Sequence, residues 1–241
     1  MNAIDLSLYL VLDPDLCGGP AGMVHTAIQA AKNGATVVQL RAPNWKKRQW
    51  LATAFELKAA LAPYGVPLII NDHIDVALAV DAEGVHVGQG DLPALETRRL
   101  IGPDKILGLS VGSAEEMATV PAAGVDYLGI GPVYPTGTKA DAGEATGVAL
   151  FAELVAATAL PVVAIGGIHR DNCSPLFEAG TDGVAVNDAI ISDRGYLLGV
   201  VVEVDATSCK VMTILHPSFN AAGVISRTRE NGIITGSADY A

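Results

Sequence analysis

The stretch Val125-Asp126-Tyr127-Leu128-Gly129-Ile130-Gly131-Pro132-Val133-Tyr134-Pro135-Thr136-Gly137-Thr138-Lys139 predicts an apolar strand, 125–130, that runs directly into a loop. Proline fixes φ and glycine permits backbone angles closed to other residues, so we expect a stiff, shaped turn. Thr136, Thr138 and Lys139 offer hydroxyl and ammonium donors that suit a phosphate or pyrophosphate. On these residues alone, a proline-rich connection with a solvated lysine explains the loop equally well.

The same strand pattern recurs along the chain. Eight short apolar runs lie at 8–12, 36–40, 66–70, 84–87, 106–109, 125–130, 161–165 and 183–186, and helical patterns follow the first seven. Ser113 and Glu116 predict a capping box at the start of one of these helices. Nearly all-apolar strands separated by helices indicate a parallel sheet covered by helices. Eight strands close a (β/α)8 TIM barrel, an α/β fold; an open doubly wound sheet is the alternative, but no GxGxxG follows the first strand.

Composition narrows the classes of function. The 241 residues are 50% hydrophobic, and the formal net charge of −11 argues against nucleic-acid and anionic-membrane surfaces. The three cysteines form no CxxC pair, so neither a disulfide framework nor a zinc site is expected. We see no signal peptide and no membrane-length apolar run. We therefore expect a cytoplasmic protein that acts on small molecules, with an oligomeric state that the sequence leaves open.

Polar and glycine residues gather just after the predicted strands. They are Gln39 and Arg41, Asn71 and Asp72, Gln89 and Asp91, Ser110, then Thr136, Thr138 and Lys139, and finally Gly166-Gly167. In a barrel these positions converge on one face, where such enzymes place their chemistry. The pattern therefore predicts a single site at the carboxyl ends of the strands.

Asp72 and Asp91 would follow neighbouring strands and offer two carboxylates to Mg²⁺, which takes one or two carboxylates and completes its shell with water and phosphate oxygens. The alternative is that each aspartate caps the next helix, which Pro93 supports. Arg41 and Lys139 would hold pyrophosphate oxygens, although either alone is more often a solvated charge.

Gly166-Gly167 would allow close approach of the backbone to a phosphate, beside the next helix N-terminus. Gln39 and Asn71 would hydrogen-bond a polar heterocycle; alternatively they satisfy loop backbone groups. His73 and His86 are expected to be structural, and no histidine has an obvious serine or cysteine partner for a nucleophilic triad.

Six motifs follow one another along the chain. They are Val38-Gln39-Leu40-Arg41, Ile70-Asn71-Asp72, Gly84-Val85-His86-Val87-Gly88-Gln89-Gly90-Asp91, Gly108-Leu109-Ser110, Gly129 to Lys139, and Ala164-Ile165-Gly166-Gly167-Ile168. Taken together, in this order and at these spacings, they make residues 8 to about 191 resemble the thiamine phosphate synthase family of β/α barrels. The resemblance implies an enzyme that joins a hydroxymethylpyrimidine pyrophosphate to a thiazole phosphate and releases pyrophosphate.

The resemblance also implies a role for each site residue. It places Mg²⁺ on Asp72 and Asp91, and the pyrimidine near Gln39. It places pyrophosphate on Arg41, Asn71, Ser110 and Lys139, of which Arg41, Ser110 and Lys139 would be catalytic. It assigns the thiazole phosphate to Thr136, Thr138 and Gly167. The implied mechanism is dissociative, so the residues must stabilise a charged leaving group rather than act as a general base.

Two positions in the barrel depart from the family pattern. Pro43 stands where the family commonly has a lysine, for which Lys46, Lys47 or Arg48 could substitute. Asn187-Asp188 follow the eighth strand where a small or hydroxyl residue is usual, and the Asp188 carboxylate would repel the thiazole phosphate unless it points away.

The third departure is the tail. We expect a barrel at 1–192 that lacks its usual last helix and a β-rich segment at 193–241. Strands are predicted at 197–204, 210–215, 225–228 and 232–235, with a turn at 227–232 around Asn231-Gly232. This segment resembles part of the β domain of the rod-shape protein MreC, so a chimera is one explanation.

Two alternative functions stay open. One is a thiazole tautomerase-like relative, although such relatives tend to carry a histidine where this chain has Pro132. The other is a catalytically impaired phosphate-binding barrel fused to a β scaffold segment.

Overall fold

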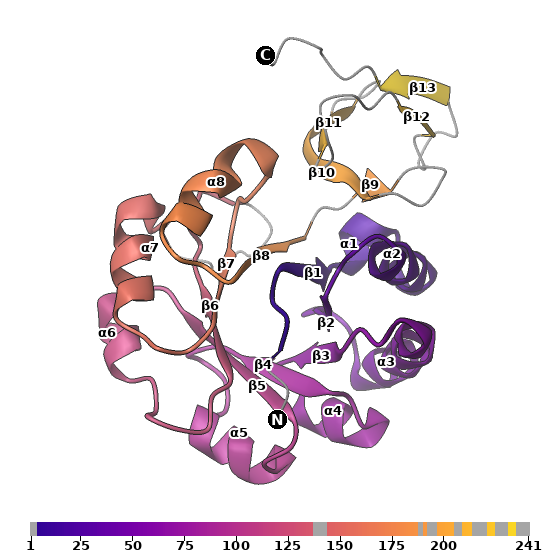
Figure 1. Cartoon of the computed structure of the whole chain (residues 1–241). Helices are drawn as coiled ribbons and strands as arrows, with labels where there is room; N and C mark the ends of the chain where they lie inside the picture. The colour runs from indigo at the N-terminus through magenta and orange to yellow at the C-terminus, as the bar shows by residue number, and fades with distance from the viewer. Residues whose placement is uncertain are drawn as a thin grey trace.

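The computed structural model describes residues 4–136 and 144–187, together with the segments 190–191, 197–204, 209–213, 221–224 and 231–234. Its main body is a closed barrel of eight parallel strands in sequence order (Figure 1). The strands are β1 (Leu8–Leu12), β2 (Val37–Leu40), β3 (Leu68–Asn71), β4 (Gly84–Val87), β5 (Ile106–Val111), β6 (Tyr127–Ile130), β7 (Val162–Ile165) and β8 (Gly183–Val186). β8 pairs with β1 through Val184 and Leu8, which closes the ring. The predicted barrel is confirmed, and the open doubly wound sheet is wrong.

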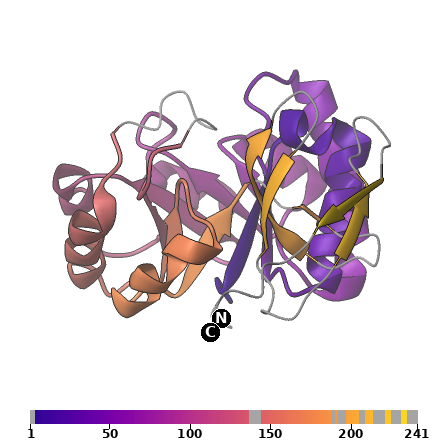
Figure 2. The ribbon, with the colours of Figure 1, turned by 90° about the horizontal axis from the view of Figure 1, so that it is seen from above.

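Helices surround the strands in Figure 1, and those of the first and second halves of the chain lie on opposite sides (Figure 2). They are α1 (Pro14–Cys17), α2 (Pro20–Lys32), α3 (Lys47–Leu61) with the 3₁₀ turn η1 (Ala62–Tyr64), α4 (Ile74–Val80), α5 (Ala94–Ile101), α6 (Ala114–Ala118), α7 (Gly147–Ala156) and α8 (Arg170–Glu178). In α3 the residues Trp50, Ala54, Leu57 and Leu61 are buried, as their helical spacing predicts.

Two apolar cores follow from the alternation of side chains along each strand. In β1, Tyr9 and Val11 belong to the core inside the barrel, whereas Leu10 and Leu12 belong to the core under the helices. The interior core comprises Leu6, Tyr9, Val11, Val37, Ile69, Tyr127, Val163 and Ala185. The interior is therefore filled rather than hollow along most of its length, and a site can open only at the strand ends.

The predicted capping box is only half correct. Ser113 Oγ accepts from the Glu116 amide at 3.2 Å, so Ser113 does cap α6. The Glu116 carboxylate, however, accepts from the Gly112 amide at 2.7 Å instead of the Ser113 amide. The reason is that the loop after β5 turns Gly112 toward Glu116, whose side chain also lines a cavity described below.

The described tail consists of short antiparallel strands, and no helix follows β8 among the described residues (Figure 1). Its strands are β9 (Ile190–Ile191), β10 (Leu197–Val204), β11 (Cys209–Thr213), β12 (Ala221–Val224) and β13 (Asn231–Ile234). The strand predicted at 225–228 falls outside the described residues. Asn231 and Gly232 lie within β13, paired with Val224 and Gly223, so the prediction of a turn at this pair was wrong. Residues 227–230 of the predicted turn lie outside the described residues. In the described part of the chain, no helix is both long and apolar enough to cross a membrane.

Candidate active site

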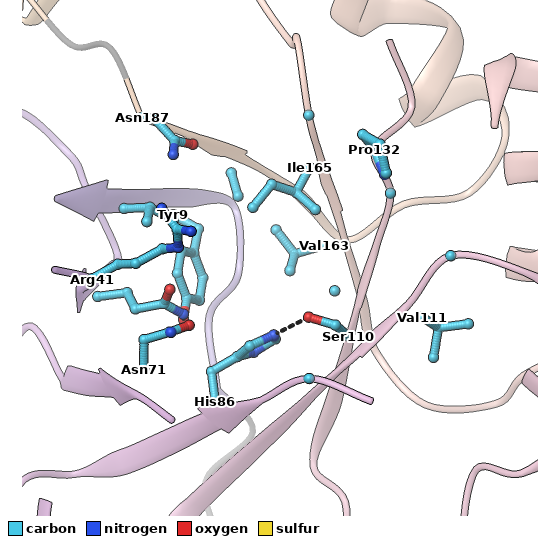
Figure 3. A pocket seen from close by; sticks show the side chains of 18 of the residues that line it. Tyr9, Arg41, Asn71, His86, Ser110, Val111, Pro132, Val163, Ile165 and Asn187 are labelled. Carbon is cyan, nitrogen blue, oxygen red and sulfur yellow. Dashed lines mark hydrogen bonds between the residues drawn. The ribbon is translucent and has the colours of Figure 1, made fainter. Parts of the chain in front are cut away.

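Two adjoining cavities open at the carboxyl ends of the strands. The inner cavity has a volume of about 290 Å³ and is lined by side chains from across the barrel (Figure 3). The outer cavity, of about 690 Å³, extends over the loops after β1 to β4. Their walls share Arg41, Asn71, Gly88, Gln89, Gly90 and Ser110. A ligand longer than one ring could therefore occupy both.

The structure brings most of the predicted site residues together. Gln39, Arg41, Asn71, Ser110 and Thr136 line the inner cavity, and Asp72 and Asp91 line the outer cavity. Gly166 lines the inner cavity, whereas Gly167 lines neither. Thr138, Lys139 and Asp188 lie outside the described residues.

Asp72 and Asp91 have well-defined local partners. Asp72 follows β3 with a φ of 59°, a left-handed conformation that aspartate tolerates better than most residues. Asn71 Nδ2 donates to Asp72 Oδ2 at 2.5 Å, and the Gly88 amide donates to Asp91 Oδ2 at 2.8 Å. The N-cap positions of α4 and α5 are held by His73 and Pro93, so neither aspartate is the N-cap residue of these helices.

The Arg41 guanidinium is held at the cavity wall by a carboxylate that sequence analysis missed. Arg41 Nη1 lies 3.8 Å from Asp13 Oδ2, and both side chains are largely buried. Asp13 also accepts from the Asp15 amide at 2.9 Å, which fixes the start of α1. The pair places a cation between the two cavities while limiting its freedom to turn away.

A buried chain of hydrogen bonds crosses the barrel interior, and sequence analysis missed this as well. Gln39 Nε2 donates to Tyr9 Oη at 2.8 Å, and the Tyr9 and Tyr127 hydroxyls lie 2.8 Å apart. Tyr127 Oη lies 2.9 Å from His86 Nδ1, and His86 Nε2 lies 2.9 Å from Ser110 Oγ (Figure 3). Burial raises the pKa of both tyrosines well above the usual range. These phenols therefore act as neutral hydrogen-bonding groups.

His86 thus belongs to the cavity wall, unlike His73. The ring of His73 packs edge-on against Trp50, its Nδ1 lies 2.7 Å from Lys47 Nζ, and burial lowers the pKa of this imidazole. The signal for His86 was its place in strand β4, where it is the register partner of Asn71 and so faces the same interior. A single histidine in an apolar run cannot be assigned to a cavity wall unless the strand register is known.

The loop after β6 packs against the glycine pair after β7. Gly166 and Gly167 have φ values of 98° and 62°, and a Cβ on Gly166 would lie 2.5 Å from Pro132 Cα. This close approach requires glycine, and it sets Pro132 and Thr136 into the inner cavity wall.

The structure shows which residues line the cavities near the two barrel positions that depart from the family pattern. Pro43 lines the outer cavity, and none of Lys46, Lys47 and Arg48 lines either cavity. Lys47 instead pairs with Asp75 at 2.6 Å. Asn187 lines the inner cavity.

Comparison with known proteins accounts for most of the chain. Residues 8–190 match the family model described as thiamine monophosphate synthase. The thiamine-phosphate synthase of Laribacter hongkongensis is 54% identical over 187 residues, which covers 78% of this chain and 88% of the relative. That of Desulfitobacterium hafniense is 50% identical over 192 residues, covering 80% and 92%.

A solved structure, thiamine phosphate pyrophosphorylase from Pyrococcus furiosus, aligns with a TM-score of 0.69 at 36% identity, covering 76% of this chain and 86% of that one. Residues 178–241 match the model described as the barrel core of the rod shape-determining protein MreC. This second match covers the tail and overlaps the end of the first.

Proposed function

The chain belongs to the thiamine monophosphate synthase family, and we propose that it joins a hydroxymethylpyrimidine pyrophosphate to a thiazole phosphate within the two adjoining cavities. It is a thiamine-phosphate synthase, a transferase. The observation that carries the substrate assignment is the meeting of Arg41, Asn71 and Ser110 in the wall shared by both cavities, beside Asp72 and Asp91.

The pyrophosphate is assigned to that shared wall. Arg41 offers a planar set of donors, Asn71 an amide and Ser110 a hydroxyl, which is the donor set that an anionic diphosphate needs. We add Lys139 from its motif. When the carbon–oxygen bond breaks, its electron pair leaves on the pyrophosphate, and these donors stabilise the developing charge. The thiazole nitrogen then uses its lone pair to form the new carbon–nitrogen bond.

Asp72 and Asp91 are proposed to hold Mg²⁺. Hard carboxylate oxygens in the wall of the outer cavity fit this ion, and the described residues contain no cluster of three or more His, Cys, Asp or Glu side chains suited to a metal. Two carboxylates would suffice for Mg²⁺, which in proteins completes its shell with water and substrate phosphate oxygens. When bound, the ion would neutralise the charge of the leaving pyrophosphate. The hydrogen bonds from Asn71 and Gly88 hold the two carboxylates in place.

The two ring systems are assigned to the inner cavity. Gln39 is buried at the inner wall, with its amide nitrogen committed to Tyr9, so its carbonyl oxygen can accept from a pyrimidine amino group. The thiazole phosphate is assigned to Thr136, Thr138 and Gly167, beside the glycine pair after β7. Asn187 would lie near this phosphate and offers an amide donor.

The direct test is release of pyrophosphate from purified protein incubated with both precursors and Mg²⁺. We expect release that depends on both precursors and on Mg²⁺, with formation of thiamine phosphate. Intact ligand binding without release would instead favour the impaired phosphate-binding barrel, and proton transfer on the thiazole alone would favour the tautomerase-like relative.

Asp91→Asn tests the metal assignment. We expect this variant to lose Mg²⁺-dependent turnover by about a hundredfold or more, because one of two charged oxygen ligands is gone. The matched control is Glu96→Gln, which removes an exposed carboxylate on α5 that pairs with Arg99. Turnover of Asp91→Asn equal to that of Glu96→Gln would show that Asp91 does not hold the metal.

A further inference from the structure

The buried hydrogen-bond chain connects two residues that serve different parts of the substrate under the proposed function, on which this inference rests. It begins at Gln39 on β2, passes through Tyr9 on β1, Tyr127 on β6 and His86 on β4, and ends at Ser110 on β5. Gln39 faces the pyrimidine position and Ser110 faces the pyrophosphate position. The three residues between them join the two.

The direction of the chain follows from counting hydrogens. Gln39 donates to Tyr9 Oη, so Tyr9 has a single hydrogen left to give, and Tyr127 Oη is the acceptor that the described residues offer it. Having accepted from Tyr9, Tyr127 gives its own hydrogen to His86 Nδ1. In the reverse order, the hydrogen of the buried Tyr9 hydroxyl would have no acceptor among the described residues, which is costly.

We propose that this chain is a positioning device that sets Ser110 as a hydrogen-bond donor to the substrate. With Nδ1 accepting from Tyr127, a neutral His86 carries its proton on Nε2 and donates it to Ser110 Oγ. Ser110 then has its own hydrogen to direct into the cavity, where the anionic pyrophosphate needs a donor. Without the chain, Ser110 could satisfy itself by donating to the imidazole.

Two glycines on neighbouring strands make room for the rings of the hydrogen-bond chain. A Cβ on Gly108 would lie 2.2 Å from Tyr127 Cζ and 2.4 Å from His86 Nδ1, and a Cβ on Gly129 would lie 3.0 Å from His86 Cε1. Glycine at these two interior positions of β5 and β6 allows the rings of Tyr127 and His86 to lie where their hydrogen bonds require. The geometry of the chain is thus fixed by the barrel itself.

The first test reads the His86 imidazole by ¹⁵N NMR of the full chain without ligand. We expect a protonated Nε2 and an unprotonated, hydrogen-bond-accepting Nδ1. Tyr127→Phe should shift the Nδ1 resonance because it removes the donor, and Tyr9→Phe should shift it less. The control Thr181→Val deletes a buried hydroxyl that bonds Val162 and Gly183 at the opposite ends of the strands, and should leave His86 unchanged. A proton on Nδ1, or on both nitrogens, overturns the proposal.

The second test measures binding of pyrophosphate with Mg²⁺ by calorimetry in a double-mutant cycle. Tyr127→Phe should weaken this binding about three- to tenfold when Ser110 is present, since a charge-assisted hydrogen bond is misdirected. It should have no further effect in Ser110→Ala, and Thr181→Val should have no effect at all. An equal loss in both backgrounds, or no loss, overturns the positioning role.

The two proposals fail separately. Neither the NMR measurement nor the binding measurement needs turnover. If the hydrogen-bond chain behaves as expected but the protein has no synthase activity, only the proposed function is refuted. Normal synthase activity with a doubly protonated or Nδ1-protonated His86 would refute only the positioning device.

Discussion

At the scale of single residues, Tyr9 and Tyr127 make the free energy of unfolding depend on pH in the alkaline range. Burial raises the pKa of both phenols in the folded protein, whereas in the unfolded chain they titrate near about 10. Below that pH both states are neutral and the full stability is present. Above it, only the unfolded state releases protons, so the free energy of unfolding falls by up to about 1.4 kcal/mol per pH unit for each phenol.

Urea denaturation between about pH 9 and about pH 11 measures this slope. Tyr127→Phe should remove the contribution of one phenol to the slope, while Thr181→Val, which deletes a buried hydroxyl that does not titrate in this range, should leave the slope as it is. Parallel pH profiles for all three proteins would contradict the prediction.

Some of the site residues could be predicted from the sequence, and others could not. Arg41, Asn71, Asp72, Asp91 and Ser110 could be placed near one another because each follows a strand, and parallel strands end at one face. The hydrogen bonds that join Tyr9, Tyr127 and His86 could not be predicted from the sequence. Inward-facing polar side chains inside apolar runs cannot be told from ordinary core residues. Their bonding depends on strand register across the ring, which is a property of the closed barrel.

At the scale of elements, Arg98 anchors helix α5 to the barrel. Its guanidinium donates to the Gly102 and Lys105 carbonyls at 2.7 and 2.6 Å and to Asp126 Oδ2 at 2.6 Å, and Asp126 in turn accepts from the Leu107 amide. The side chain is only 16% exposed. The arginine thus ties α5 to the beginnings of β5 and β6.

Arg98→Met should lower the free energy of unfolding by about 2–3 kcal/mol, because it keeps the aliphatic stem but leaves Asp126 and the carbonyls without their donor. The neighbouring Arg99 pairs with Glu96 on an exposed face, so Arg99→Met should change stability by less than about 0.5 kcal/mol. Chemical denaturation of both variants checks this. Equal losses would show that the helix is not anchored by Arg98.

Among elements, the barrel strands were predictable and the tail was less so. Each of the eight predicted strands lies within two residues of the observed bounds, because strands buried on both faces form continuous apolar runs. The tail strands at 197–204 and 209–213 also agree closely with their predictions. The Asn231-Gly232 error arose because this pair has strong turn propensity, yet pairing with β12 holds it in a strand.

At the scale of the whole molecule, the described residues after β8 form short strands, and none of them is helical. In Figure 1 the chain leaves β8 for short antiparallel strands, and β9 contacts α2. On α8, the last helix among the described residues, Phe177 is 48% exposed. We propose that the barrel domain ends near residue 192 and that its edge beside α8 is incompletely covered.

This arrangement predicts a lower melting temperature than that of the Laribacter hongkongensis relative, by about 5 °C or more, since each kcal/mol shifts such a domain by roughly 2–4 °C. It also predicts binding of a dye specific for exposed apolar surface. Phe177→Gln should reduce dye binding more than Phe55→Gln, which changes a 51% exposed side chain on α3. Equal melting temperatures without dye binding would contradict the prediction.

The pairing of β8 with β1 also has a consequence for synthesis of the protein. The pairing partners of Leu8, Tyr9 and Leu10 are Val184, Ala185 and Val186, which are synthesised much later. The ring therefore cannot close until the ribosome has released nearly the entire barrel. At about 5–20 residues per second, this interval lasts on the order of ten seconds or more. Throughout it, the nascent sheet has open edges that can pair with another chain. The risk of misassembly is therefore concentrated in translation, before the mature protein exists.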